Sequence, residues 1–323
     1  MRKLLVIGLA AALSLGASQA FAACNTLKQL GNIKLQQRGG VWGIPVGING
    51  VPKTMMLDTG MGITLISPET VEELKLPTRP TSNALLVSST GERSYGYTNI
   101  KALALVGAGQ FTNSDYIIDV PLAGGAKRPI TAPAGYIGLE LLSHFDFDMD
   151  LKNGVLNLFD LDHCDGQVIY WKTDSAVWVP FAWDPQGRIR FKVTLDGTQL
   201  YAVMNTMDSD DALNLNYYKS QVKFDETAAD TQLLGETGDG GKLYRHTFSL
   251  LDLGGIGIKN PSVVLREDKL KQVARSTASI GSNIRDTETQ REPDITLGVS
   301  TMAKLHIYVA SKEKKIYISP PPQ

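Results

Sequence analysis

The stretch that decides the fold reads MMLDTGMGITLIS and covers residues 55–67. Apolar residues lead directly into Asp58, and Thr59 and Gly60 follow it before a second apolar run begins at Ile63. An acidic side chain at the end of a core strand is costly unless it is paired or used in chemistry. Glycine permits a tight turn and leaves backbone N–H groups free to bond the carboxylate. The stretch therefore predicts two buried strands joined at a reactive aspartate.

This stretch lies inside an internal repeat. The segment IPVGINGVPKTMMLDTG, beginning at Ile44, aligns with FKVTLDGTQLYAVMNTM, which begins 147 residues later at Phe191. The same offset holds without a gap as far as Asn113 and Asn260. A register kept over so long a stretch indicates a duplicated lobe.

A second alignment covers the ends of the two lobes. The segment GYIGLELLSHFDFDMDLKNGVLNLF around Gly138 resembles ITLGVSTMAKLHIYVASKEKKIYIS around Gly298, 160 residues later. The second lobe therefore contains 13 additional residues compared with the first. They fall in the polar, charged stretch 266–294, which we interpret as a surface insertion.

The local patterns are mostly those of β-strands. Apolar residues alternate with a period of two in short runs. The pairs Asn49-Gly50 and Asp196-Gly197 separate such runs, and both are typical of two-residue hairpin turns. Residues 68–74 are a candidate short helix with Ser67 as its N-cap. The predicted fold class is all-β, with one short helix in each lobe.

The motif around Asp58 resembles the active-site motif of pepsin-like and retropepsin-like aspartic peptidases. Residues 135–142 resemble the apolar element that packs behind that motif, and residues 150–156 resemble the strand-turn-strand that follows it. The resemblance extends over residues 30–320 and is strongest to bacterial exported members. It implies two similar acid-protease-like β-barrel lobes with a cleft between them.

The resemblance also implies a mechanism. Two aspartates, one from each lobe, lie about 3 Å apart and share a proton and a water in this family. One takes a proton from the water while the other protonates the carbonyl of the peptide bond. Asp58, Thr59 and Gly60 correspond to the catalytic motif, and Ser89, Thr90 and Gly91 correspond to a flap that closes over bound peptide.

The second lobe departs from the family pattern. At the 147-residue offset, Asp58 aligns with Asn205, Thr59 with Thr206 and Gly60 with Met207. A shifted register would use Asp208 instead, but it requires a deletion, so we favour Asn205 as the partner. An Asp–Asn pair can hold a water but cannot relay a proton as a carboxylic acid does. The loss of one acid–base group typically lowers a rate by about 10²–10⁴-fold.

Three functions remain open on the sequence alone. The protein hydrolyses peptide bonds through Asp58 at a reduced rate or with Asp208 as a rearranged second acid. Alternatively, it is an inactive pseudo-peptidase that binds a peptide or protein segment in the cleft. In the third alternative, the duplicated lobe is a structural domain without an open cleft.

The N-terminus predicts export. Basic residues precede an apolar run that ends in Ala20-Phe21-Ala22, which is typical of a cleaved signal peptide over residues 1–22. The residues before Cys24 lack the aliphatic residue of a lipoprotein signal, so no lipid anchor is expected. We expect a periplasmic protein without a membrane span. In such a compartment the only two cysteines, Cys24 and Cys164, are expected to form a disulfide.

The composition limits which other kinds of protein and binding site are to be expected. The chain has 323 residues, a net charge of −1 and 31 glycines, which fits a turn-rich globular protein and gives no global attraction to nucleic acid. The four histidines show no metal-ligand spacing, so neither a metal nor a cofactor is expected. The run 208–211 is interpreted as an exposed acidic turn. We expect a monomer with an N-terminal lobe over 23–160, a linker over 161–176 and a C-terminal lobe over 177–323.

Overall fold

The computed structural model describes residues 24–87, 91–129, 131–222, 224–237, 240–267 and 292–321. The predicted signal peptide, Ser89, Thr90 and most of the predicted insertion lie outside the described residues. Within the described ranges, no helix combines the length and apolar character needed to cross a bilayer.

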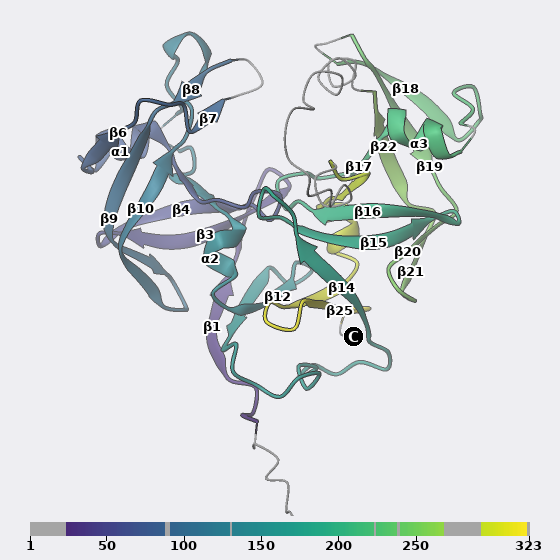
Figure 1. Cartoon of the computed structure of the whole chain (residues 1–323), viewed down its shortest axis with the longest axis horizontal. Helices are drawn as coiled ribbons and strands as arrows, with labels where there is room; N and C mark the ends of the chain where they lie inside the picture. The colour runs from purple at the N-terminus through teal and green to yellow at the C-terminus, as the bar shows by residue number, and fades with distance from the viewer. Residues whose placement is uncertain are drawn as a thin grey trace, which may run out of the picture.

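The architecture is all-β and two-lobed, as predicted (Figure 1). The first lobe is built on an eight-stranded sheet in the order β2-β3-β4-β11-β5-β10-β9-β6, and an additional β3–β9 pairing closes it on itself. The strands of this sheet are β2 (Gln36–Arg38), β3 (Val41–Ile48), β4 (Val51–Leu57), β5 (Leu65–Ile66), β6 (Thr78–Pro80), β9 (Gly96–Leu105), β10 (Gln110–Ile118) and β11 (Gly135–Ile137).

The second lobe repeats this plan within the largest sheet. Its strands are β14 (Val177–Trp183), β15 (Ile189–Leu195), β16 (Thr198–Met204), β17 (Asp211–Asn214), β18 (Thr231–Glu236), β19 (Lys242–Thr247), β20 (Leu250–Asp252), β21 (Gly257–Lys259), β22 (Ser262–Arg266) and β23 (Ile295–Leu297). In both lobes a hairpin leads into the motif strand, and a later strand pairs with that strand in parallel: β11 with β4, and β23 with β16.

The two hairpin turns form where the sequence predicts them. The central residues Asn49 and Gly50 have φ values of 49° and 86°, and those of Asp196 and Gly197 are 44° and 82°. Positive φ at both positions is the conformation that Asn-Gly and Asp-Gly pairs tolerate best. The register of each motif strand is thus set by turn chemistry as well as by its apolar face.

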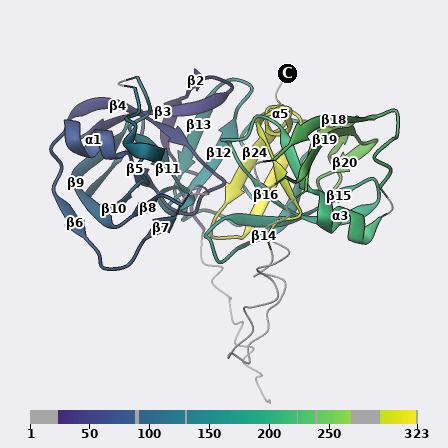
Figure 2. The ribbon, with the colours of Figure 1, turned by 90° about the horizontal axis from the view of Figure 1, so that it is seen from above.

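A shared sheet joins the lobes. It consists of β1 (Gln29–Lys34), β13 (Val155–Phe159) and β12 (Asp146–Asp150) from the first half, and β24 (His306–Ala310), β25 (Lys315–Ser319) and β14 from the second. The central contact is the antiparallel β12–β24 pair, in which Asp148 lies opposite Tyr308. Figure 2 shows β12, β13 and β24 of this sheet between the two lobes. Strand β14 continues from this sheet into the second lobe, where it pairs with β15.

The helices are short, but they are more numerous than the one per lobe that was predicted. They are α1 (Pro68–Glu73), α2 (Leu139–Leu142), α3 (Leu215–Gln221), α5 (Val299–Met302) and the 3-10 turn η1 (Ala123–Gly125). Helix α1 confirms the predicted helix and its cap, because the Ser67 side chain accepts a hydrogen bond from the Thr70 N–H. Helices α2 and α5 each follow a glycine, Gly138 and Gly298, and had no clear periodic signal because each is one turn long.

The predicted disulfide is confirmed. Cys24 and Cys164 are bonded across a sequence separation of 140, with their Cα atoms 4.9 Å apart. The bond ties the segment before β1 to the chain between the lobes. Two adjacent backbone hydrogen bonds, Cys164 N to Asn25 O and Asp160 N to Lys28 O, fix the same contact.

Candidate active site

Strand β4 carries Asp58 to the centre of the molecule. Met56 and Leu57 pair in parallel with Tyr136 and Ile137 of β11, and the Asp58 N–H continues the ladder to the Ile137 carbonyl at 3.0 Å. The Asp58 side chain is only 6% exposed. Its Oδ1 accepts a hydrogen bond from the Gly60 N–H at 3.0 Å, which is the role that the sequence assigns to this glycine.

The environment of Asp58 favours its protonated form. Burial raises its pKa most strongly, the Gly60 N–H opposes that shift, and the nearby negative charge of Asp208 adds to it. The result is a pKa raised to about 6. A carboxyl with this pKa exchanges a proton readily near neutral pH, as a general base must.

Asn205 occupies the matching place in the second lobe. Strand β16 pairs in parallel with β23, and the Asn205 N–H continues that ladder to the Leu297 carbonyl at 2.9 Å. The backbone of Asn205 is therefore held as the backbone of Asp58 is held. The structure places Asn205, and not Asp208, at the position equivalent to Asp58.

Two threonines lock the motifs together. The Thr59 N–H donates to the Thr206 hydroxyl at 3.1 Å, and the Thr206 N–H donates to the Thr59 hydroxyl at the same distance. The Thr206 hydroxyl in turn donates to the Leu57 carbonyl at 2.6 Å. Both side chains are fully buried. The symmetric exchange brings the ends of β4 and β16 into direct contact.

Gly60 packs directly against the Asn205 side chain. A Cβ atom at position 60 would lie 2.4 Å from Asn205 Cγ, so no other residue fits there without displacing the amide. The equivalent position in the second lobe is Met207. Its N–H donates to Asn205 Oδ1 at 2.9 Å, just as the Gly60 N–H donates to Asp58.

Asp208 completes the cluster. Its Oδ2 accepts a hydrogen bond from Asn205 Nδ2 at 2.8 Å. Burial raises the pKa of Asp208, while the hydrogen bond from Asn205 and the charge of Arg266 act in the opposite direction. The sequence contained Asp208 as a rival for the position of Asn205, whereas in the structure the two residues form a hydrogen-bonded pair.

The interpretation of residues 208–211 as an exposed acidic turn is wrong. Asp211 is buried, and it accepts hydrogen bonds from the Gly298 N–H at 2.8 Å and the Thr301 hydroxyl at 2.6 Å. In the first lobe, Thr64 accepts from the Gly138 N–H at 3.0 Å in the same way. Asp211 therefore secures the glycine behind the second motif, a role that the exposed-turn pattern gave no reason to expect.

One of the three flap candidates, Gly91, lies within a separate two-stranded hairpin. Strands β7 (Leu86–Val87) and β8 (Arg93–Ser94) pair antiparallel, and Gly91 lies exposed between them with a φ of 93°. Ser89 and Thr90 lie outside the described residues. The hairpin is present as a fold element, and its role as a flap stays a prediction.

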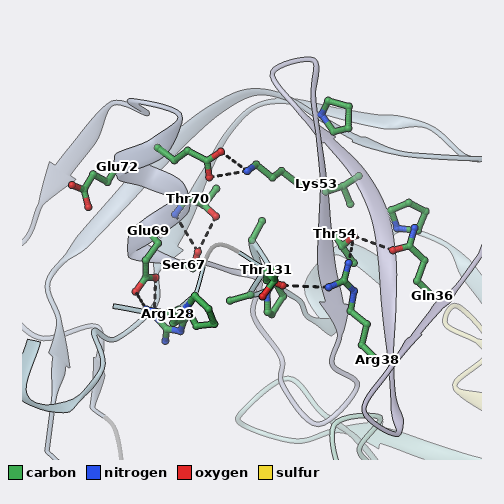
Figure 3. A pocket seen from close by; sticks show the side chains of 18 of the residues that line it. Gln36, Arg38, Lys53, Thr54, Ser67, Glu69, Thr70, Glu72, Arg128 and Thr131 are labelled. Carbon is green, nitrogen blue, oxygen red and sulfur yellow. Dashed lines mark hydrogen bonds and ion pairs between the residues drawn. The ribbon is translucent and has the colours of Figure 1, made fainter. Parts of the chain in front are cut away.

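Two cavities accompany these elements. One, of about 750 Å³, lies on the flank of the first lobe between α1, β4 and residues 127–134, and no residue of either motif lines it (Figure 3). The ion pairs Lys53–Glu73 and Arg128–Glu69 lie within its wall. A smaller cavity of about 390 Å³ opens beside Asp208 in the second lobe. We regard the smaller cavity as the one relevant to the paired motifs, because it reaches one of their residues.

Within the described part of the chain, no three His, Cys, Asp or Glu side chains are grouped so that they could hold a metal ion. Two of the four histidines, His163 and His306, instead pair with aspartates of the shared sheet. His163 Nε2 lies 2.7 Å from Asp146 Oδ2, and His306 Nε2 lies 2.7 Å from Asp148 Oδ1.

Comparison with known proteins finds one matching family model. Residues 44–128 match the family model described as aspartyl protease, a range that begins in β3 and includes Asp58, Thr59 and Gly60. Among solved structures, one similar chain is Basic 7S globulin from soybean, with a TM-score of 0.48 and 11% sequence identity over 91% of this chain and 95% of that chain. No protein of curated function matches this sequence.

Proposed function

We propose that this chain, whose residues 44–128 match the aspartyl protease family model, hydrolyses peptide bonds with Asp58 as the base and Asn205 as a neutral hydrogen-bond donor. The observation that carries this proposal is the reciprocal Thr59–Thr206 contact, which keeps the two motif ends together although one aspartate is missing. The fold thus retains the arrangement on which chemistry at Asp58 depends.

The reaction follows from the groups at hand. Ionised Asp58 takes a proton from a water, and the water oxygen forms a bond to the carbonyl carbon of the peptide. An N–H of Asn205 donates to the carbonyl oxygen as negative charge develops there. Asp58 then gives its proton to the peptide nitrogen, the C–N bond breaks, and a carboxylic acid and an amine leave. The protons balance, and Asp58 returns to its ionised form.

The amide also explains why the rate is expected to be low. In the family, the second carboxyl can transfer a proton to the carbonyl oxygen, whereas an amide can only donate a hydrogen bond. Such a loss typically lowers a rate by about 10²–10⁴-fold.

The substrate we propose is an extended peptide or protein segment held in a cleft between the lobes. The hairpin β7–β8, with Gly91 between its strands, would cover the segment as a flap. Backbone hydrogen bonds to an extended segment supply affinity, and side-chain pockets supply specificity. The cavity beside Asp208 is the candidate for one such pocket.

Peptide binding without cleavage is the second candidate. It is favoured by one observation: Asn205 and Met207 replace both the acid and the glycine of the second motif, yet the hydrogen bonds that shape the motif are kept. A site that has given up proton transfer but kept its shape can still bind a peptide.

The deciding experiment is cleavage of a mixed peptide library by the purified mature protein, with products identified by mass spectrometry. The matched variants are Asp58→Ala and Asp210→Asn, the latter because Asp210 is a partly exposed residue paired with Arg245. Turnover that disappears in Asp58→Ala and persists in Asp210→Asn supports hydrolysis. Peptide binding without any turnover in the wild type favours the binding role.

We further propose that the protein works outside the cytoplasm, in the periplasm. The Cys24–Cys164 disulfide supports this, since such bonds persist in oxidising compartments.

A further inference from the structure

We propose that Asp208 is a positioning residue, which fixes the Asn205 amide so that one N–H of Nδ2 stays available for a substrate carbonyl. This inference deepens the proposed function and rests on it for its consequence in catalysis. The geometric part concerns the resting protein and holds or fails independently of turnover.

The amide of Asn205 is held at both ends. Its Oδ1 accepts from the Met207 N–H at 2.9 Å, and its Nδ2 donates to Asp208 Oδ2 at 2.8 Å. A flipped amide would place an N–H group against the Met207 N–H and an oxygen against the carboxylate, so that both contacts would become repulsive. The amide nitrogen carries two hydrogens, and Asp208 engages one of them. The other is left with its direction fixed.

Asp208 is itself held firmly enough to act in this way. Its backbone carbonyl accepts from the Val299 N–H at 2.8 Å, and a Cβ atom on Gly298 would lie only 2.9 Å from that carbonyl. Met61 takes the same place in the first lobe, where its carbonyl accepts from the Leu139 N–H at 2.9 Å. The two lobes therefore differ in side chains on a common backbone frame. The first has Asp58 with Met61, and the second has Asn205 with Asp208.

In this arrangement the carboxylate of the second lobe comes from a different residue than in the family. The negative charge that the family places at the position of Asn205 is here three residues later. From there it is attracted by the positive charge of Arg266 on β22, and it adds to the negative field at Asp58. Asp208 and Arg266 both line the smaller cavity described above, together with the charged residues Arg188, Glu292 and Asp294.

Two variants separate position from charge. In Asp208→Asn, the new side-chain oxygen can still accept from Asn205 Nδ2, so the orientation is kept and the charge is lost. In Asp208→Leu, both the hydrogen-bond acceptor and the charge are lost, while the side-chain volume stays similar. Asp210→Asn is the matched control, because it removes a carboxylate two residues away that pairs with Arg245 at 2.8 Å.

The first readout needs no turnover. The side-chain amide of Asn205 is followed by ¹H–¹⁵N NMR, and the hydrogen bonded to the carboxylate is expected to resonate downfield and to exchange slowly. We expect this signature to disappear in Asp208→Leu and to remain unchanged in Asp210→Asn. An Asn205 signal that is the same in the wild type and in Asp208→Leu overturns the inference.

The second readout is kinetic. We expect Asp208→Leu to lower kcat by about 10²-fold with little change in KM, the size of effect that a misplaced catalytic group produces. Asp208→Asn is expected to keep kcat within a few-fold of the wild type while its rate rises at a slightly lower pH. Burial, the main cause of the raised Asp58 pKa, remains, and only the smaller contribution of the Asp208 charge is gone. Equal loss of kcat in both variants would make the carboxylate itself the reacting group and would overturn the positioning role. If the wild type does not cleave peptides, the proposed function fails, and the NMR comparison still decides this inference.

Discussion

Thr59 and Thr206, 147 residues apart in the chain, each donate a backbone N–H to the hydroxyl of the other at 3.1 Å. Each lobe therefore gives one hydrogen bond to the motif of the other lobe and receives one in return. The Thr206 hydroxyl has the larger share of bonds, because it also donates to the Leu57 carbonyl. Truncating it should therefore damage both motifs at once.

Thr206→Val tests this contact through stability. The change leaves the Thr59 N–H and the Leu57 carbonyl without their buried partner, at a cost of about 1–3 kcal/mol for each group. We expect a corresponding fall in the free energy of unfolding, measured by urea denaturation. Thr112→Val, at an exposed threonine of β10, is the control and should change it by no more than about 0.5 kcal/mol. Equal effects at the two sites would contradict a special role for the Thr59–Thr206 contact.

The pH dependence of cleavage is expected to follow Asp58 alone. Because Asp58 acts as the base when ionised and its pKa is raised to about 6, the rate should rise as the pH increases through that value and then level off. The Asn205 amide has no ionisable proton in this range, so the plot of rate against pH should show no second, falling limb. The measurement is kcat/KM across the acidic to neutral range. A maximum in acid followed by a fall near pH 6 would show that a shared proton, and not the free carboxylate, is required.

Asp58 should reduce stability at neutral pH. Below the ordinary aspartate pKa of 3.8 its carboxyl is protonated in both folded and unfolded states, and above about 6 it is ionised in both. A raised pKa means that the folded state favours the proton, so this stabilising contribution is lost as pH rises between the two values. A difference of two pKa units corresponds to about 3 kcal/mol. We expect Asp58→Asn to raise the free energy of unfolding by about that amount at neutral pH. In strong acid, where both proteins carry a neutral group, the gain should vanish.

Restoring the missing acid is expected to need two changes. In Asn205→Asp, the new carboxylate lies against Asp208 and close to Asp58, so three acidic groups share one partly buried site. Like charges at this spacing raise the pKa of the group and destabilise the ionised cluster. We expect the single variant to unfold more easily at neutral pH and to regain stability in acid. Asn205→Asp combined with Asp208→Asn should relieve the repulsion and give the faster enzyme at acidic pH. If the single variant is as stable and as fast as the double, Asp208 does not restrict the site.

His163 should make the shared sheet sensitive to pH. Burial acts to lower its pKa, but hydrogen bonds to the Cys164 carbonyl and to Asp146 outweigh burial and raise it above the ordinary histidine value of 6.5. The stabilising contribution is therefore complete below 6.5 and is lost as the pH rises through the folded pKa. We expect the free energy of unfolding to fall over this range and His163→Gln to flatten the slope. His144→Gln, at an exposed histidine, should keep the slope of the wild type.

The sequence predicted those features that depend on local chemistry or on the repeat. The turn at Asn49-Gly50, the N-cap at Ser67 and the strand that ends at Asp58 each need only neighbouring residues. The offset of 147 residues then placed Asn205 opposite Asp58, because duplicated lobes share one backbone plan. The disulfide needed only an even count of two cysteines.

The remaining features depend on contacts that no short pattern encodes. Asp208 bonds to the amide three residues before it, because the turn after β16 brings its carboxylate back. Asp211 is buried because it bonds to Gly298, 87 residues later, and an acidic run alone indicates only a solvated turn. Gly62 likewise packs against the Gln186 carbonyl of the other lobe, a contact that neither segment signals by itself.

The disulfide between Cys24 and Cys164 also determines the covalent connectivity of the molecule. It closes a ring that contains every strand of the first-lobe sheet, whereas the second lobe extends from that ring as an open chain. A single cut by a protease anywhere inside the ring, for instance at the hairpin β7–β8, opens it without releasing a fragment. The clipped molecule keeps its full mass until a thiol reductant is added. A cut in the second lobe leaves a break that no disulfide spans. Clipping of the two lobes, although they are copies of one plan, is thus distinguishable on a gel run with and without reductant.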